Sequence, residues 1–409
     1  MSNNLNMQNS IAKLLDGVAV EWKALGEIGL LIRGSGLQKK DFTETGVPAI
    51  HYGQIYTYYG TFATETKSFV SAKLAEKLKK AKYGDILLAG TSENVKDVMT
   101  PLGWLGGEIV FSGDMFAFRP SNLINTKYLT YFLQTTPFQK FKEKYANGTK
   151  VIRISSEKFL TFKIPIPPLH VQTEIVRILD TFTELTAELT AELTAELTAR
   201  KKQYNYYRDK LLTFKEDEVE WKTLGEVANY SNTRISFNKL NEKNYVGVDN
   251  LLQNQAGKTN SNHVPKEGNF TEYLTDDILI GNIRPYLKKI WQADCFGGTN
   301  GDVLVIRLKN NLLTYRYLYH ILANDNFFEY NMQHSKGAKM PRGNKEAILK
   351  YRLPIPSLEE QDRIVKILDK FDVLTNSITE GLPREIELRQ KQYEYYRNLL
   401  LNFPKVEDK

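Results

Sequence analysis

Polar and basic side chains gather in two loops, residues 147–153 and 336–342, which lie 189 positions apart in the chain. Further groups of the same kind follow two short apolar runs, residues 86–88 and 278–280. Arginine can bond guanine through two hydrogen bonds and asparagine can do so with adenine, whereas lysine and threonine mostly hold phosphates. A solvated loop position is the alternative for each side chain. The candidates for DNA contact are Thr91, Ser92, Asn94, Asn147, Thr149, Lys150, Arg153, Asn282, Arg284, Tyr286, Lys288, Lys336, Lys339 and Arg342.

The sequence offers little for catalysis. It contains no Asn/Asp-Pro-Pro-aromatic motif for amino methylation, no glycine-rich adenosylmethionine loop and no Walker lysine signature. Residues 21–23 and 220–222 match the tail of a nuclease Glu-x-Lys motif, but both flank a tryptophan, which favours a structural role. The histidines are scattered without metal-ligand spacing, so we expect neither a metal nor a cofactor in this chain; they are His51, His170, His263, His320 and His334.

Composition allows a polyanionic partner without requiring one. The net charge is +7 and the pI is about 9.0, and neutralisation of phosphates by lysine and arginine drives most non-specific DNA affinity. No apolar run approaches the length of a membrane span. The single cysteine, Cys295, excludes an internal disulfide and is expected to be a small buried residue in a reducing compartment. We therefore expect a cytoplasmic protein that does not cross a membrane.

The elements that position the loops occur twice. Residues 20–27 return as 219–226 with seven of eight positions identical, while the residues between the repeated stretches diverge almost completely. Two further pairs share one offset, 165–182 with 354–371 and 200–214 with 389–403. The layout is therefore a variable domain followed by a shared helix, stated twice.

The shared stretches predict long helices. Each follows a proline-rich extended segment, and apolar residues then recur at helical spacing. In the first copy three TAEL units continue the helix, whereas residues 381–383 (Gly-Leu-Pro) should kink or break the second. If the helices pack antiparallel, the variable domains sit at opposite ends of a rod with pseudo-two-fold symmetry. This predicts an α+β fold of two globular domains and two long antiparallel helices, with boundaries at 1–168, 169–215, 216–357 and 358–409.

These repeated motifs resemble one known family. Pro-Ile-Pro-x-Leu leads into Gln-x-x-Ile-Val-[Arg/Lys]-Ile-Leu-Asp, each helix ends in [Lys/Gln]-Lys-Gln-Tyr-x-Tyr-Tyr-Arg, and TAEL units lie between the variable domains. The combination is similar to the specificity subunits of Type I restriction-modification systems, in the subgroup with TAEL spacers. The resemblance covers about a third of the chain, namely the shared segments.

The resemblance implies a function and a set of partners. Each variable domain would be a target-recognition domain that reads one half of an interrupted site in double-stranded DNA. The helices would set the spacing and dock two methyltransferase subunits, which use S-adenosylmethionine, and restriction subunits that need ATP and magnesium would join. The tyrosine clusters would pack the helix ends or meet the methyltransferase, and the residues concerned are Tyr204, Tyr207, Arg208, Tyr393, Tyr396 and Arg397.

The TAEL run is interpreted as a ruler between two readers. Each unit adds about 6 Å of helix, and its leucines sweep about the width of one apolar face; they are Leu185, Leu189, Leu193 and Leu197. Solvated filler is the alternative for the run. For the whole chain, two alternatives stay open: a self-sufficient DNA-modifying enzyme, or a structural scaffold whose variable domains bind proteins.

Overall fold

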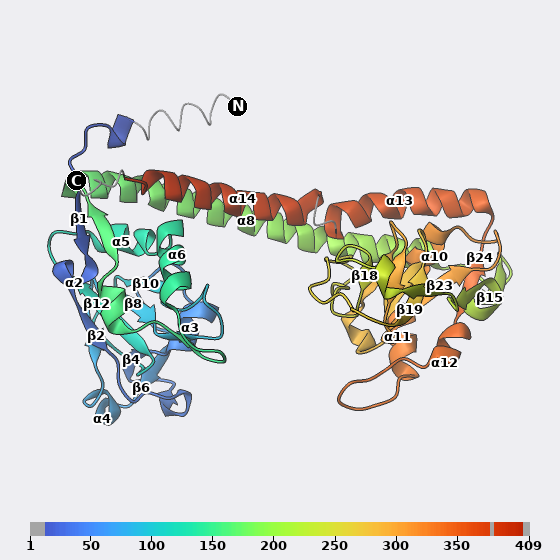
Figure 1. Ribbon diagram of the computed structural model, residues 1–409, viewed down its shortest axis with the longest axis horizontal. Helices are drawn as coiled ribbons and strands as arrows, with labels where there is room; N and C mark the ends of the chain where they lie inside the picture. Colours follow the sequence, from blue (N-terminus) through green and yellow to red (C-terminus); the bar gives the residue numbers. More distant parts are fainter. Residues whose placement is uncertain (1–12, 377–379, 404–409) are drawn as a thin grey trace. The chain divides into compact units, whose positions relative to one another are not determined.

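The computed structural model describes residues 13–376 and 380–403. The chain forms two compact units, one of Met1–Glu188 with Gln390–Lys409 and the other of Leu189–Arg389. We call them unit 1 and unit 2. Each combines a mixed α/β domain with parts of the helices (Figure 1). Among the described residues, no helix combines the length and apolar character needed to cross a membrane.

Unit 1 is built on two five-stranded sheets. The first has the order β2 (Gly29–Arg33), β12 (Met115–Pro120), β8 (Ile86–Ala89), β10 (Pro101–Trp104) and β5 (Phe62–Ala63). The second has the order β3 (Phe42–Thr43), β6 (Ser68–Val70), β4 (Val47–Ile50), β11 (Ile109–Phe111) and β7 (Lys80–Ala81). All four residues of β8 are buried, which explains why this strand reads as a continuous apolar run.

Unit 2 repeats this plan with fewer strands. Its first sheet has the order β16 (Ala228–Tyr230), β23 (Val303–Leu308), β20 (Ile278–Gly281) and β21 (Ile290–Gln292). Its second has the order β17 (Arg234–Ser236), β19 (Asn269–Tyr273), β22 (Gly297–Thr299) and β18 (Tyr245–Val246). The first four strands of the first sheets correspond in order. Their third strands, β8 and β20, also have similar sequences, since residues 83–88 read Tyr-Gly-Asp-Ile-Leu-Leu and residues 275–280 read Thr-Asp-Asp-Ile-Leu-Ile.

Short helices complete both units. Those of unit 1 are α2 (Leu25–Ile28), α3 (Tyr52–Thr57), α4 (Ala72–Ala75), α5 (Thr126–Phe132), α6 (Thr136–Tyr145) and α7 (Ser156–Leu160), with the 3-10 turn η1 (Lys39–Asp41). Those of unit 2 are α9 (Leu224–Val227), α10 (Tyr315–Leu322), α11 (Asp325–Gln333) and α12 (Lys345–Leu349), with η2 (Phe237–Lys239) and η3 (Pro285–Leu287).

A two-stranded ribbon closes each domain where it meets the helix. In unit 1, β1 (Glu21–Ala24) pairs with β14 (Lys163–Ile166), and in unit 2, β15 (Glu220–Thr223) pairs with β24 (Arg352–Ile355). The lysine of each Glu-x-Lys motif forms an ion pair with the glutamate of the same motif. These motifs therefore belong to a structural ribbon, as their position beside a tryptophan suggested.

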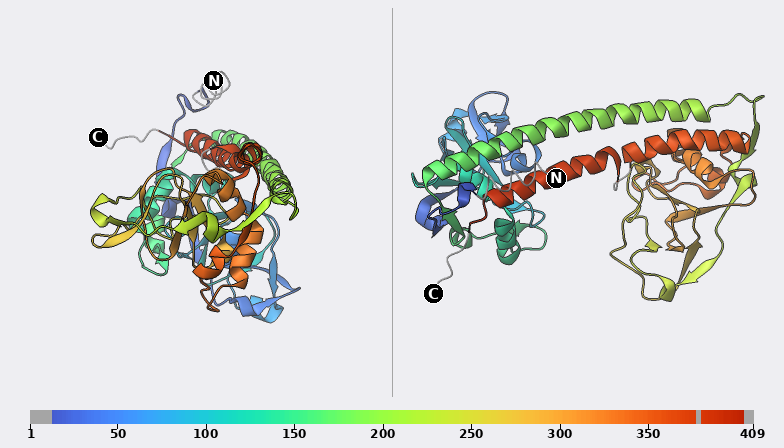
Figure 2. Two further views of the ribbon diagram at one scale, coloured as in Figure 1. Left: turned by 90° about the vertical axis from the view of Figure 1, so that its right-hand side faces the viewer. Right: turned by 90° about the horizontal axis from the view of Figure 1, so that it is seen from above.

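The long helices follow the predicted pattern. α8 (Leu169–Leu212) has 44 residues, and Val171, Ile175 and Leu179 on its apolar face are buried. The second helical segment consists of α13 (Leu358–Asn376) and α14 (Gly381–Leu400) (Figure 2), so residues 381–383, where a kink or break was predicted, form the start of the second of these helices; residues 377–379 lie outside the described part of the chain. Gly381 adopts a φ of +76°, a left-handed conformation that favours glycine.

Helices pack against each other within both units. In unit 1, α8 and α14 run antiparallel, since Phe182 stacks near Tyr396 at 5.6 Å while Thr183 lies 2.9 Å from the hydroxyl of Tyr393. In unit 2, the rings of Tyr204 and Tyr207 on α8 both lie against Phe371 of α13. The predicted α+β class, with two repeated domains and long helices, is confirmed.

A buried glutamine fastens each domain to its helix. The Oε1 atom of Gln172 accepts from the backbone N–H of Asn125, the N-cap of α5, and its Nε2 atom donates to the carbonyls of Leu123 and Pro167. Gln361 makes the same three bonds in unit 2, to Thr314, Leu312 and Pro356. Both glutamines are fully buried. The glutamine present in both shared motifs therefore attaches each domain to its helix through three hydrogen bonds to the backbone.

Candidate DNA-binding site

In unit 1 the fold brings together two candidate segments that are distant in the sequence. The strand β9 (Thr91–Ser92) pairs antiparallel with β13 (Ile152–Arg153), with Arg153 opposite Thr91. Arg153 also exchanges two backbone hydrogen bonds with Asn147, each 2.9 Å long. The loop 147–153 is therefore a hairpin fixed to the end of the central sheet rather than a free loop. We call it hairpin 1.

Hairpin 1 presents its side chains to solvent on a constrained backbone. Asn147, Thr149, Lys150 and Arg153 are all exposed. Its turn requires Gly148, which adopts a φ of +115°, and a Cβ atom there would lie 2.1 Å from the carbonyl oxygen of Val151. An ordered backbone with exposed polar tips loses little entropy when it binds, so this arrangement suits recognition.

Unit 2 repeats the arrangement with different side chains. Arg342 forms an isolated antiparallel β-bridge with Ile283, and it also exchanges two 2.9 Å backbone hydrogen bonds with Lys336. The backbone N–H of Arg284 donates to the carbonyl of Pro341 at 2.7 Å, which holds the two segments together. We call residues 336–342 hairpin 2. Its Lys336, Lys339 and Arg342 are exposed, and Gly337 has a φ of +96° at the turn.

Other candidates are placed where they support the hairpins. Thr91 and Asn282 are only 6% exposed. Ser92 accepts from the backbone N–H of Asn94, whose side chain in turn bonds Asp97 on both sides. Burial leaves Thr91 and Asn282 little polar surface for a base, whereas Asn94 is exposed and stays a candidate.

The basic turn of unit 2 combines strain with partial exposure. Arg284 and Lys288 both have left-handed φ angles, of 53° and 50°, on either side of η3. Arg284 and Tyr286 are exposed, whereas the ammonium of Lys288 pairs with Asp325 at 2.9 Å. Arg342 pairs with Asp302 at 3.2 Å while keeping 56% of its side chain exposed. The structure therefore leaves Arg284, Tyr286 and Arg342 as the accessible groups here.

A buried ion pair supports the central strand in each unit. The carboxylate of Asp85 accepts from Nε and NH2 of Arg119 at 2.8 and 2.7 Å, and Asp277 accepts from Arg307 at 3.0 and 2.7 Å. Each aspartate is 1% exposed. The hydrogen bonds from Asp85 and Asp277 raise the pKa of their arginines. Sequence reasoning missed these pairs, although the aspartates occupy matching positions in the similar stretches 83–88 and 275–280.

A buried lysine supports the segment after β9. Lys142 on α6 is 5% exposed, and its ammonium donates to the backbone carbonyl of Lys96. Burial lowers the pKa of Lys142 to about 8. The corresponding position in unit 2 is Asn331, which is fully buried. A charged support for the reading segment is therefore specific to unit 1.

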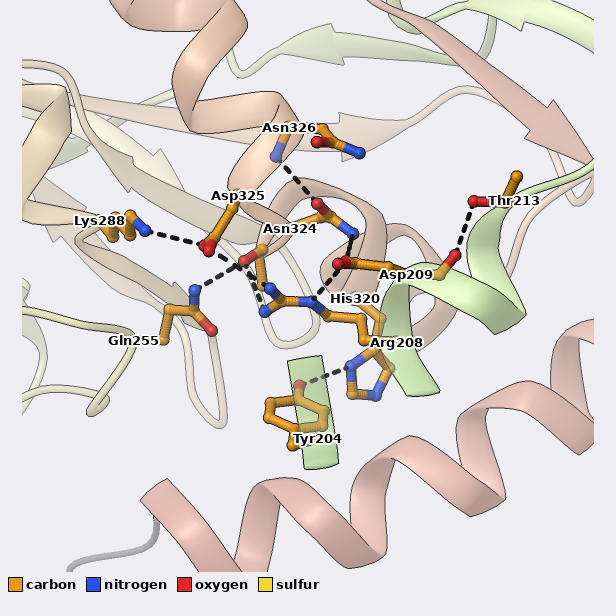
Figure 3. Close-up of polar contacts among 11 residues, drawn as sticks. Tyr204, Arg208, Asp209, Thr213, Gln255, Lys288, His320, Asn324, Asp325 and Asn326 are labelled. Carbon is orange, nitrogen blue, oxygen red and sulfur yellow. Dashed lines mark hydrogen bonds and ion pairs between the residues drawn. The ribbon is translucent and has the colours of Figure 1, made fainter. Parts of the chain in front are cut away.

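The tyrosine and arginine clusters mainly pack the helix ends. Arg208 is 1% exposed, and its NH1 atom donates to the carbonyl of Ala323 at 3.2 Å (Figure 3). Tyr204 is also buried, with its hydroxyl 3.5 Å from Nδ1 of His320. In unit 1, Tyr396 is buried and Arg397 donates to Gln134 at 3.1 Å. Partner contact stays a prediction for the exposed part of this set.

The two units differ in the side chains that surround an aspartate found at the same position of each long helix. In unit 2, Asp369 bonds both Arg316 at 2.6 Å and the Nε2 atom of His320 at 2.7 Å. The corresponding Asp180 of unit 1 bonds Lys127 at 2.6 Å and the hydroxyl of Tyr131 at 2.8 Å. Burial lowers the pKa of His320, which keeps this imidazole neutral near pH 7. In the described residues no three His, Cys, Asp or Glu side chains cluster as metal ligands.

Comparison with known proteins agrees with the duplicated architecture. The family described as Type I restriction modification DNA specificity domain matches residues 18–199 and again 216–388. The chain is 35% identical to the specificity subunit of the Type I restriction enzymes EcoR124I and EcoR124II of Escherichia coli, covering 97% of this chain and 98% of that one. It is 32% identical to a putative Type I restriction enzyme specificity subunit of Haemophilus influenzae, covering 97% and 99% of the two chains.

A solved structure shares the fold. It comes from work on complex assembly and conformational transition of the Type I system, is 16% identical in sequence and covers 95% of this chain and 98% of its own, with a TM-score of 0.63. The match of the family to both halves, together with relatives above 30% identity over nearly the whole chain, establishes the assignment. The chain belongs to the family of DNA specificity subunits of Type I restriction-modification systems.

Proposed function

We propose that the chain reads an interrupted site in double-stranded DNA, with hairpin 1 reading one half-site and hairpin 2 reading the other. The observation that carries this proposal is the repetition of one hairpin geometry with different exposed side chains. Both hairpins are fixed by paired backbone hydrogen bonds, at Arg153 and at Arg342. A constant frame with variable tips is what a reader of two unrelated half-sites needs, because base choice depends on side chains while docking depends on backbone placement.

The chain acts as the targeting subunit for chemistry performed by others. Its partners are two methyltransferase subunits, which supply S-adenosylmethionine chemistry on adenine, and restriction subunits that use ATP and magnesium. The complex would act in the cytoplasm, where it meets its DNA target. The net charge of +7 supports a polyanionic target.

The test is to co-express the chain with its methyltransferase partner and to map adenine methylation across a random DNA library. Two short fixed blocks around a constant unread gap are expected. A single continuous motif would show that only one unit reads DNA. Methyl transfer by the purified chain alone, with no partner subunit, would instead favour a self-sufficient enzyme.

The two hairpins can be tested separately within the same assay. Exchanging residues 147–153 for the hairpin of a relative with another target should change one block and leave the other block and the gap unchanged. The reciprocal exchange of residues 336–342 is the matched control and should change only the other block. A change in both blocks from either exchange would contradict the division of labour.

A further inference from the structure

The first sheet of unit 2 ends at an open edge where unit 1 has another strand. In unit 1, β5 follows β10 as the fifth strand, parallel to it, whereas in unit 2 the sheet stops at β21. The segment of unit 2 that lies between β18 and β19, where unit 1 has β5, pairs with itself instead. Leu251 bridges Lys258 there, and the backbone N–H of Leu252 donates to Gly257 at 2.9 Å.

Unit 1 shows which atoms such an edge offers. The backbone N–H groups of Gly103 and Leu105 donate to the carbonyls of Thr61 and Ala63, each at 2.9 Å. Between these bonds the ring of Phe62 lies under the ammonium of Lys127, 5.1 Å from it. One strand of two or three residues therefore satisfies the edge with two hydrogen bonds and one aromatic contact.

The register of unit 2 identifies the corresponding donors. In unit 1 the backbone N–H of Trp104 donates to the carbonyl of Asp85, and in unit 2 the backbone N–H of Ala293 donates to the carbonyl of Asp277. Ala293 is therefore the counterpart of Trp104. Gln292 and Asp294 therefore correspond to Gly103 and Leu105. Within residues 13–376 and 380–403, no acceptor is found for the backbone N–H of Gln292 or Asp294. Gln292 is half-buried and Asp294 is exposed.

A cavity of about 750 Å³ lies beside this edge, and its charge points to a basic occupant. This volume is within the range of roughly 300–1,000 Å³ that is usual for binding pockets. Arg316, the counterpart of Lys127, lines it and can meet an aromatic ring as Lys127 does. The acidic residues of the lining outnumber the basic ones by four to two; they are Asp276, Asp294, Asp369 and Asp372 against Lys258 and Arg316.

We propose that this edge and cavity form a docking site for an extended, basic segment of a partner protein, which adds as a strand parallel to β21. The segment places an aromatic or aliphatic residue beside Arg316 and lysine or arginine against Asp276 and Asp294, since Asp369 and Asp372 already pair with Arg316. Strand addition at an open sheet edge is a recurring mode of peptide recognition, in which backbone bonds give affinity and pockets give specificity. The excess of carboxylates disfavours nucleic acid here, so this site goes beyond the reading of DNA.

The test uses the full chain and a fluorescent peptide, Lys-Gly-Thr-Phe-Ala-Lys-Lys, which keeps the sequence of Gly60–Ala63 and adds lysines. Fluorescence anisotropy should show saturable binding. Gln292→Pro removes one outward N–H without touching the pairing with β20, and proline is tolerated on edge strands. It should weaken binding by about tenfold through the lost bond and the bulk of the ring. Gln292→Ala is the matched control, because it also loses the side-chain bonds to Asp276 and Arg316 but keeps the N–H group, and it should bind about tenfold more tightly than Gln292→Pro.

Amide exchange provides the second measurement. The N–H groups of Gln292 and Asp294 should exchange rapidly in the chain alone and become protected with the peptide. Slow exchange of both in the chain alone would overturn the proposal, because the chain or a second copy would then close its own edge. Equal binding by the proline and alanine variants would overturn it as well. So would equal binding of a peptide with glutamates in place of the lysines.

Discussion

Removing the arginine of hairpin 1 should impair the reading of one half-site only. Arg153 is exposed, and in the described part of the chain its guanidinium has no ion-pair partner, so its truncation should change stability by no more than about 0.5 kcal/mol. A bidentate arginine–guanine contact discriminates against a wrong base by about 1–3 kcal/mol, which is roughly 5- to 150-fold. Arg153→Ala should therefore relax one position of the first block by a factor in this range.

The equivalent change in hairpin 2 should have a smaller effect. Arg342 pairs with Asp302 at 3.2 Å, and both side chains are more than a third exposed. Such a pair is worth about 0–1 kcal/mol, and DNA must compete with it for the guanidinium. Arg342→Ala should therefore relax only the second block, with a loss lower than that of Arg153→Ala by up to roughly fivefold.

The assay is methylation mapping with the co-expressed methyltransferase, and Arg177→Ala and Arg363→Ala are matched controls. These two arginines carry the same charge on α8 and α13, where each pairs with a glutamate three residues before it. Both controls should leave the motif unchanged. Relaxation of both blocks by Arg153→Ala, or of neither, would refute the reasoning. Uniform weakening at every base, with a salt dependence shallower by about one unit, would assign Arg153 to a phosphate instead.

Three further outcomes follow from the same geometry. Deleting Thr194–Leu197 shortens α8 by about 6 Å, so methylation mapping should show an unread gap shorter by one or two base pairs with both blocks intact; an unchanged gap would defeat the ruler. Gly148→Ala should abolish reading of the first block, because its Cβ has no room, whereas Gly337→Ala, whose Cβ would meet its nearest neighbour at 3.4 Å, should only weaken the second; equal effects in binding assays would contradict this. The lowered pKa of Lys142, about 8, means that the unfolded chain binds this proton more tightly, so its contribution to stability should rise as the pH rises through 8 towards 10. Denaturant melts should show a flatter pH profile for Lys142→Met, and an identical profile would place this ammonium in solvent.

The repeats made the architecture predictable, because a long helix is a local structure and the sequence states it twice. The burial of Ile175 and Leu179 and the start of α14 at Gly381 follow directly from spacing and composition. The pairing of Thr91 with Arg153 could not be predicted in this way. It joins segments separated by three strands and two helices, and a contact between such segments depends on packing of the whole domain rather than on any local pattern.

The same limit explains why some candidates have side chains that are buried or already paired. Asn282 and Lys288 have the residue types of DNA contacts, yet one is buried and the other is paired with Asp325. The type of a residue shows which groups its side chain can bond. Only the folded structure shows whether that side chain is accessible or already paired. The aspartates of the buried ion pairs show the converse. Asp85 and Asp277 occupy matching positions in the similar stretches 83–88 and 275–280, but their partners Arg119 and Arg307 are distant in sequence and no local pattern predicts them.

The division between constant and variable residues has a physical basis. The buried polar side chains found in both units secure backbone: Gln172 and Gln361 bond main-chain groups at the helix start, and the buried aspartates accept from main-chain N–H groups as well as from arginine. Side chains on the hairpins make few contacts with the fold, namely the exposed pair of Arg342 with Asp302 and the bond from Asn147 to the carbonyl of Tyr145, so they can change at little cost in stability. A protein built this way can acquire a new DNA target by replacing the tips of one hairpin. The other half-site and the spacing are then unaffected, because neither depends on those tips.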